Sequence, residues 1–304
     1  MMKNLDKYKG IIPAFYACYD DEGNISPERI QKLALHYLEK GVKGLYVGGS
    51  SGECIYQTVE ERKLVLENVM KAVGGKMTII AHIAAPSTRD SVELAKHAES
   101  LGVDALAAIP PIYFVLPEAS IEAYWTSMIE ATSLDFIIYN IPQTTGYALS
   151  VDLFKKMMEK DQVIGVKNSS MPVMDINVFK LNSEKESIIF NGPDEQFVGG
   201  RVMGADAGIG GTYGVMPELF LEADKCIKEK NMEKAFEIQT AINEIIFKML
   251  SYGGNLYDVM KLILGMNGVE VGRVRGPLSP VAKEREESVV EAKEMIDAAI
   301  SKFC

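Results

Sequence analysis

GLYVGGSSGECIYQTVEERKLVLENVMKAV, residues 44–73, contains one complete strand, loop and helix. The apolar run Gly44–Val47 is typical of a buried strand, and the glycines after it indicate a turn. Thr58 then begins a capping box that Glu61 completes, and apolar side chains at positions 66, 69, 70 and 73 share one helical face. This unit predicts a strand of a parallel sheet together with its covering helix.

The same alternation of short apolar runs and helical patterns continues from Tyr8 to about Met216. Further helices begin at Ser26, Ser87 and Ser150, which are typical N-cap residues. The predicted strands are Gly10–Phe15, Gly44–Val47, Thr78–Ile83, Ala105–Ile109, Phe136–Tyr139, Val163–Val166, Ile188–Asn191 and Gly208–Gly210. Eight such units predict an α/β fold, a closed (β/α)8 TIM barrel, which takes about 250 residues. A doubly wound open sheet is the alternative.

Beyond Pro217 the pattern is purely helical. The predicted helices cover residues 218–229, 231–251, 255–266 and 281–302. We interpret the first as the last barrel helix and the others as additional C-terminal helices. The expected domains are therefore a (β/α)8 catalytic barrel at 1–229 and a C-terminal helical extension at 230–304.

The composition is that of a folded acidic protein. The 304 residues carry a formal net charge of -10, and 47% of them are hydrophobic and 24% charged, which argues against disorder. An acidic surface repels nucleic acid and anionic membranes, so we expect neither as a partner. The N-terminus is polar, and the cysteines are scattered, so we expect free thiols and a cytoplasmic location. These cysteines are Cys18, Cys54, Cys226 and Cys304.

Active sites of such barrels form at the carboxyl ends of the strands. The loop Gly48–Glu53 follows the strand at 44–47, and its backbone N–H groups, with the hydroxyls of Ser50 and Ser51, suit a carboxylate or a phosphate. A tight turn that merely needs glycine explains the same loop. Its spacing matches neither the Rossmann nor the P-loop fingerprint, so we do not expect a nucleotide.

Two other predicted strands lead to a titratable residue. Ile137 and Tyr139 alternate onto one face, so the phenol either points into the barrel mouth as an acid or base, or stands on the rim. On the next strand Val163, Gly165 and Lys167 share a face, and Gly165 leaves room below the lysine. An interior position would desolvate the amine, lower its pKa and make it a nucleophile toward carbonyls. An outward position would leave it a solvated cation.

The loops after the last two strands contain Asn191–Glu195 and Gly208–Thr212. Asp194 and Glu195 would repel a phosphate, so they suit a neutral, sugar-like ligand, or simply supply negative charge to a helix N-terminus. We expect no metal site, because no ligand spacing links the three histidines. We expect each of them to be structural, namely His36, His82 and His97.

Taken together, the motifs resemble those of the pyruvate-dependent aldolase superfamily, which includes dihydrodipicolinate synthase and N-acetylneuraminate lyase. The resemblance covers nearly the whole chain and is carried, in order, by GLYVGGSSGE (44–53), YNIP (139–142), Lys167, NGPDE (191–195) and GADAGIGGTY (204–213). It implies a (β/α)8 barrel with extra C-terminal helices, a homotetramer and no cofactor.

Within the superfamily the chain is similar to the N-acetylneuraminate lyases, through the GGSSGE loop and the pair Asp194–Glu195. The synthases carry an arginine that grips a second carboxylate, and this chain has Thr144 at that position. Two departures from the lyases are Gly211 in place of a serine, and the run Lys167-Asn168-Ser169 in place of a KQT-like run.

The resemblance implies that Lys167 forms a Schiff base and that N-acetylneuraminate (sialic acid) is cleaved to pyruvate and N-acetylmannosamine. It further implies that Ser50 and Ser51 hold the substrate carboxylate, that Tyr139 relays protons, and that Tyr113 reaches the site of a neighbouring subunit. The implied pocket for the sugar tail is lined by Ser169, Gly192, Asp194, Glu195, Gly210 and Gly211.

The sequence leaves two alternatives open. Another aldolase of the superfamily would act on 2-keto-3-deoxy sugar acids or make dihydrodipicolinate, and Thr144 disfavours the second reaction. A non-catalytic barrel that binds or senses a keto acid is the other alternative. Such a protein would have no need of both Lys167 and Tyr139.

Overall fold

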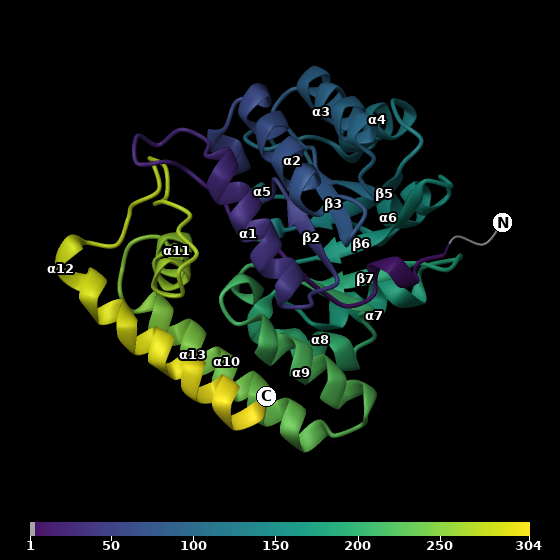
Figure 1. Ribbon diagram of the computed structural model, residues 1–304. Helices are drawn as coiled ribbons and strands as arrows, with labels where there is room; N and C mark the ends of the chain where they lie inside the picture. Colours follow the sequence, from purple (N-terminus) through teal and green to yellow (C-terminus); the bar gives the residue numbers. More distant parts are fainter. Residues whose placement is uncertain (1–3) are drawn as a thin grey trace.

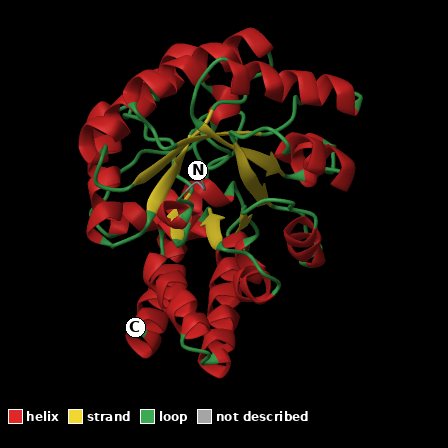
Figure 2. Cartoon of the chain, turned by 90° about the vertical axis from the view of Figure 1, so that its right-hand side faces the viewer, coloured by secondary structure: helices red, strands yellow, loops and turns green. Residues whose placement is uncertain are grey.

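The computed structural model describes residues 4–304 and forms a (β/α)8 barrel with additional C-terminal helices. Figure 2 shows the strands at the centre of the molecule with helices around them. The strands are β1 (Ile11–Pro13), β2 (Gly44–Val47), β3 (Thr78–His82), β4 (Ala105–Ala108), β5 (Asp135–Asn140), β6 (Val163–Asn168), β7 (Ile188–Asn191) and β8 (Ala207–Gly210). They form one parallel sheet in the order β1-β8-β7-β6-β5-β4-β3-β2, and a bridge between Ala14 and Tyr46 connects β1 to β2. The predicted barrel is confirmed, and the open-sheet alternative is wrong.

Helices connect consecutive strands and cover the outside of the barrel (Figure 1). They are α1 (Pro27–Glu39), α2 (Val59–Val73), α3 (Thr88–Leu101), α4 (Glu118–Glu130), α5 (Pro142–Thr145), α6 (Val151–Met158), α7 (Met174–Leu181), α8 (Phe197–Val202) and α9 (Pro217–Lys228). The predicted N-caps are confirmed, because Ser26, Ser87 and Ser150 each accept a bond from a backbone N–H three residues later. Thr58 and Glu61 form the predicted capping box of α2.

The inside of the barrel holds its own hydrophobic core, separate from the larger core between the sheet and the helices. Side chains that alternate inward from the strands form this inner core, among them Ile12, Tyr46, Ile137, Tyr139 and Phe190. The face that Ile137 and Tyr139 share is therefore the inner face of the sheet.

Strand β6 contains an irregularity that changes which of its residues face inward. Its register with β5 shifts near its start, so Val163 packs outside the barrel and Ile164 inside it. The prediction that Val163 shares a face with Lys167 is therefore wrong. Gly165 also does not leave room below the lysine, because a Cβ atom there would lie 1.8 Å from the carbonyl oxygen of Ile188. This glycine is needed because the backbone of β7 approaches so closely.

The chain after α9 forms α10 (Met232–Leu250), α11 (Leu256–Met266), α12 (Lys283–Glu286) and α13 (Val290–Phe303). In Figure 1 these helices lie on one side of the barrel, and α10 packs against both α9 and α13. The prediction of one continuous helix at 281–302 is wrong, because α12 and α13 are two separate helices. The N–H of Val281 donates to Asp258, which holds it outside the helix, and a 3-10 turn at Glu287–Val289 separates α12 from α13. Within residues 4–304, no helix combines the length and apolarity needed to cross a membrane.

Candidate active site

Lys167 points into the mouth of the barrel from β6, and the residue is only 4% exposed. Its Cα atom pairs with that of Tyr139 on β5, and its Nζ atom lies 4.0 Å from the centroid of the Tyr139 ring. From β2, the centroid of the Tyr46 ring lies 4.2 Å from the same nitrogen. The amine is therefore enclosed by two tyrosine rings and shielded from bulk water.

His82 completes the aromatic wall around the two tyrosines. Its ring centroid lies 6.0 Å from that of Tyr46 and 6.0 Å from that of Tyr139. Its Nδ1 atom is 2.8 Å from the carbonyl oxygen of Gly48. Burial, together with the charge of Arg62, lowers the pKa of His82 to about 3, so the ring is neutral at physiological pH. The hydrogen-bonding distance to Gly48 fits the structural role expected for this histidine, which stays a prediction.

The glycine-rich loop after β2 is shaped by its contacts. A Cβ atom on Gly49 would lie 2.6 Å from the Tyr46 ring, so this position requires glycine. The N–H of Glu53 donates to the carbonyl oxygen of Ser50, which folds the loop back on itself. Ser51 is buried, and Ser50 is exposed at the mouth. The loop therefore presents one buried and one accessible hydroxyl at the carboxyl end of β2.

A buried ion pair that no sequence motif indicates anchors this loop to the C-terminal helices. Glu53 ends the GGSSGE motif in a left-handed conformation with φ of 52°, and its side chain is fully buried. The amine of Lys261 on α11 donates to it at 2.6 Å, and the N–H of Arg275 donates at 2.9 Å. The pair therefore ties α11 to the loop that carries the serines.

Replacing Lys261 by methionine is expected to destabilise the protein by about 3 kcal/mol, because it leaves the Glu53 carboxylate buried without a cation. Urea unfolding monitored by circular dichroism measures the change. The double variant Glu53→Gln with Lys261→Met is the control, because it removes both charges, and it should recover part of the loss. Equal stability of wild type and Lys261→Met would contradict the role of this pair.

Tyr257, also on α11, is a second residue near the site that no sequence motif indicates. It lines a cavity beside the barrel mouth, together with Ser50 and Thr144. Burial raises the pKa of Tyr257, and hydrogen bonding to Ser51 opposes that rise. The residue follows Ser51 by some 200 positions along the chain, and no motif surrounds it. Only the packing of α11 over the loop brings the two hydroxyls together.

Asp194 is buried and lies in the loop that follows β7. Its Oδ2 atom accepts bonds of 2.7 Å from both the backbone N–H and the hydroxyl of Thr212, whereas Oδ1 is buried without a partner among the described residues. Burial raises the pKa of Asp194 to about 7. A Cβ atom on Gly210 would lie 1.9 Å from Oδ1, so this glycine makes room for the carboxyl group. The neighbouring Glu195 is exposed.

The raised pKa of Asp194 predicts a pH dependence of stability. The folded state keeps this proton up to about pH 7, whereas an unfolded aspartate loses it near its ordinary pKa of 3.8, so stability falls as pH rises through this window. Asp194→Asn stays neutral and escapes that loss. The free energy of unfolding of Asp194→Asn, relative to that of wild type, is expected to rise by about 3 kcal/mol between pH 5 and pH 8. Urea unfolding at each pH measures it. An advantage that does not change with pH would contradict the raised pKa.

The other predicted tail residues lie close to Asp194. A Cβ atom on Gly192 would lie 1.9 Å from the Ser169 hydroxyl, so the loops after β6 and β7 are in contact. A Cβ atom on Gly211 would lie 3.2 Å from the hydroxyl of Ser51, which brings the loops after β8 and β2 together. The structure therefore brings Gly192 to Ser169 and Gly210 to Asp194, whereas Gly211 lies beside Ser51 and Glu195 is exposed.

Tyr113 lies apart from this group. It is 92% exposed, its backbone has a positive φ of 84°, and its ring packs edge-on against Phe114. Phe114 and Val115 are exposed as well, at 71% and 91%. Tyr113 therefore stands on an apolar surface of the molecule and does not line the site of its own chain.

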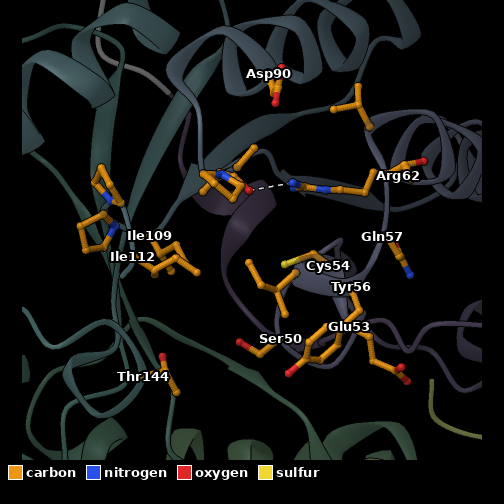
Figure 3. Close-up of a pocket in the computed structure, with 18 of the residues that line it drawn as sticks. Ser50, Glu53, Cys54, Tyr56, Gln57, Arg62, Asp90, Ile109, Ile112 and Thr144 are labelled. Carbon is orange, nitrogen blue, oxygen red and sulfur yellow. Dashed lines mark hydrogen bonds between the residues drawn. The ribbon is translucent and has the colours of Figure 1, made fainter. Parts of the chain in front are cut away.

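A cavity of about 550 Å³ opens beside the barrel mouth, between the loops that follow β2, β3 and β4 (Figure 3). Figure 3 shows Ser50 and Thr144 toward one end and Asp90 at the other. The guanidinium of Arg62 donates to the carbonyl oxygens of Ala84 and His82, both at 2.7 Å.

Within residues 4–304, no three His, Cys, Asp or Glu side chains are grouped to hold a metal ion.

Residues 7–296 match the model of the dihydrodipicolinate synthetase family. An N-acetylneuraminate lyase from Mediterraneibacter gnavus is 60% identical over 304 residues, which covers 99% of this chain and 96% of that protein. N-acetylneuraminate lyase 2 from Escherichia coli O6:H1 is 34% identical over 279 residues, or 91% of each chain. Among solved structures, a catalytic lysine mutant of the Ruminococcus gnavus sialic acid aldolase superposes over 100% of both chains with a TM-score of 0.98 and 60% identity.

Proposed function

The chain belongs to the dihydrodipicolinate synthetase family, and we propose that it is a Schiff-base aldolase that cleaves N-acetylneuraminate to pyruvate and N-acetylmannosamine. The type of reaction is inferred from one observation. The amine of Lys167 is enclosed between two tyrosine rings at the carboxyl ends of the strands. The choice of substrate is inferred from the similarity to N-acetylneuraminate lyases along nearly the whole chain. The 60% identical aldolase of known structure has a catalytic lysine, which supports the assignment of Lys167.

In the proposed reaction, the neutral amine of Lys167 attacks the C2 carbonyl of the open-chain sugar, and water leaves to give a protonated imine. A base removes the proton of the C4 hydroxyl. The electrons of the C3–C4 bond then move to the imine, so the aldehyde N-acetylmannosamine leaves and an enamine of pyruvate remains. The enamine takes up a proton at C3, and water hydrolyses the resulting imine to release pyruvate and the free amine.

Tyr139 is the proposed acid and base for these proton transfers, because it is paired with Lys167 in the sheet and reaches the same part of the barrel mouth. The carboxylate of the substrate binds the hydroxyls and N–H groups of Ser50 and Ser51. Tyr257 supports this loop from above through Ser51. His82, with its lowered pKa, adds no second positive charge beside the amine.

The glycerol-like tail of the sugar occupies the end of the mouth around Asp194. Asp194 supports this end of the mouth through Oδ2, which accepts bonds from the backbone N–H and the hydroxyl of Thr212, directly after Gly210 and Gly211. Glu195 reaches the same ligand from the outer edge. The residues proposed to line this end are Ser169, Gly192, Asp194, Glu195, Gly210 and Gly211.

A homotetramer in the cytoplasm is part of the same proposal. Tyr113, Phe114 and Val115 form an exposed apolar patch that a second copy would cover, and Tyr113 would then reach the partner's Tyr139, as the family resemblance implies. The side chains of Met171, Met174 and Val202, in and beside α7 and α8, are exposed as well and are available for a further contact. All four cysteines are free, which fits a reducing compartment. In this arrangement residues 230–304 are an extension that completes the catalytic domain through α11.

Steady-state release of pyruvate tests the choice of substrate. N-acetylneuraminate is expected to be cleaved far faster than 2-keto-3-deoxygluconate under the same conditions, because Asp194 and its neighbours hold the longer tail. Faster cleavage of 2-keto-3-deoxygluconate would assign the chain to a sugar-acid aldolase. Condensation of pyruvate with aspartate semialdehyde is expected to be absent, because the position that carries an arginine in the synthases is Thr144.

A further inference from the structure

Tyr46 presents the face of its ring to Nζ of Lys167, whereas its hydroxyl makes no hydrogen bond to a described residue. The residue is fully buried, and its hydroxyl has no hydrogen-bond partner among the described residues. A buried phenol without a partner is costly, so packing alone would favour phenylalanine here. What the residue does offer is the face of its ring, whose centroid lies 4.2 Å from Nζ of Lys167.

The two tyrosines form a corner around this nitrogen. The rings of Tyr46 and Tyr139 meet edge to face, with centroids 5.8 Å apart and planes at 82°. Nζ lies 4.0 Å from one centroid and 4.2 Å from the other, so the electron-rich faces of both rings are directed at it. The contact is built into the loop, because Gly49 is the residue that leaves space for the Tyr46 ring.

The other groups that face this corner supply little charge to balance a cation. His82 is neutral, because burial and Arg62 lower its pKa to about 3. Asp194 interacts electrostatically with Lys167. However, burial raises the pKa of Asp194 to about 7, and one of its carboxylate oxygens is bonded to Thr212. Among these protein groups, the two ring faces therefore contribute most to stabilising a positive nitrogen, and in a water-poor site such a contact is stronger than on a surface.

We propose that Tyr46 is a further catalytic residue, whose ring face stabilises the positive charge that develops on the nitrogen of Lys167 as the imine forms. This inference rests on the proposed function, because it needs Lys167 to form the imine. In that step the amine has already added to C2, the carbinolamine hydroxyl takes a proton and leaves as water, and the nitrogen acquires the charge. The ring stabilises the transition state of this step and the protonated imine that follows.

A fluorination series at position 46 tests the ring face directly. Tyr46→Phe keeps the face and removes the unpartnered hydroxyl, so kcat/KM for N-acetylneuraminate is expected to stay within about threefold of wild type. Phenylalanines with one, two, three and five ring fluorines keep nearly the same shape and progressively lose the negative face. Across this series we expect kcat/KM to fall steadily, to about one tenth at the end, and the rate of imine formation with pyruvate to fall in parallel.

The matched control is the same series at Phe303, a buried residue at the end of α13 whose ring centroid lies 4.5 Å from Nζ of Lys302. No change is expected there. A flat series at position 46 would overturn the inference, and so would a loss in Tyr46→Phe as large as that at the end of the series, because it would assign the effect to the hydroxyl.

Reductive trapping separates this inference from the proposed function. Borohydride added to the wild-type protein with pyruvate fixes the imine on its lysine, and mass spectrometry of the peptides locates it. If Lys167 is not labelled, the proposed function fails. If Lys167 is labelled but the rate of labelling is the same throughout the fluorinated series, only the role of Tyr46 fails.

Discussion

Replacing Lys167 by alanine is expected to reduce pyruvate release from N-acetylneuraminate by at least about 10⁴-fold. The described chain has two buried lysines, Lys167 and Lys261, and the second is held by Glu53 in a closed ion pair. No other buried amine is therefore available to form the imine. The fold should survive, because alanine fits the space and the two tyrosine rings keep their mutual contact.

Steady-state kinetics and circular dichroism of Lys167→Ala measure these two effects. Lys248→Ala is a suitable control, because Nζ of Lys248 also lies near a tyrosine ring, 5.3 Å from the centroid of Tyr252, but on the surface of α10. This variant should retain full activity. Activity of Lys167→Ala above about one hundredth of wild type would contradict the Schiff-base mechanism.

Tyr139→Phe is expected to lower kcat by about 10²- to 10³-fold, the usual contribution of a positioned acid or base. The ring that packs against Tyr46 and His82 is retained, so stability should change little. The loss should appear in turnover, whereas pyruvate should still be trapped on Lys167 at long reaction times. This separation distinguishes loss of proton transfer from loss of the site.

Tyr147→Phe provides the comparison for Tyr139. It removes a phenol whose hydroxyl bonds to Glu118 at 2.8 Å, away from Lys167, and it should leave kcat unchanged. Turnover of Tyr139→Phe within about threefold of wild type would show that another group carries the proton. Tyr257, which reaches Ser51 from α11, would then be the next residue to replace.

Local signals in the sequence predicted most of the barrel. Gly44–Val47 and Ile188–Asn191 agree at both ends with β2 and β7, and the capping box of α2 is present, because such features depend on neighbours within one turn. The glycine-rich β8 is also in place although its own pattern is weak. The shift in β6 could not be predicted, since it depends on how β5 and β7 pair with that strand.

The residues of the candidate site also include some that local sequence signals indicate and others that only the folded chain brings together. Lys167 and Tyr139 could be identified because each lies at the carboxyl end of an apolar strand. Tyr46 stood inside the first motif, but its pattern was that of an ordinary strand residue, and only the closed barrel brings it to Lys167. Tyr257 and Lys261 come from α11, and nothing in their surroundings in the chain points to the loop they contact.

In the proposed mechanism, one enclosed amine bonds covalently to a 2-keto acid. Incubation of the wild-type protein with pyruvate and borohydride, followed by peptide mass spectrometry, tests it most directly. We predict one reduced pyruvate adduct per chain, located on Lys167, and irreversible loss of lyase activity in proportion to labelling. An unmodified Lys167, or an adduct on another lysine that accompanies the loss of activity, would show that Lys167 does not form the imine.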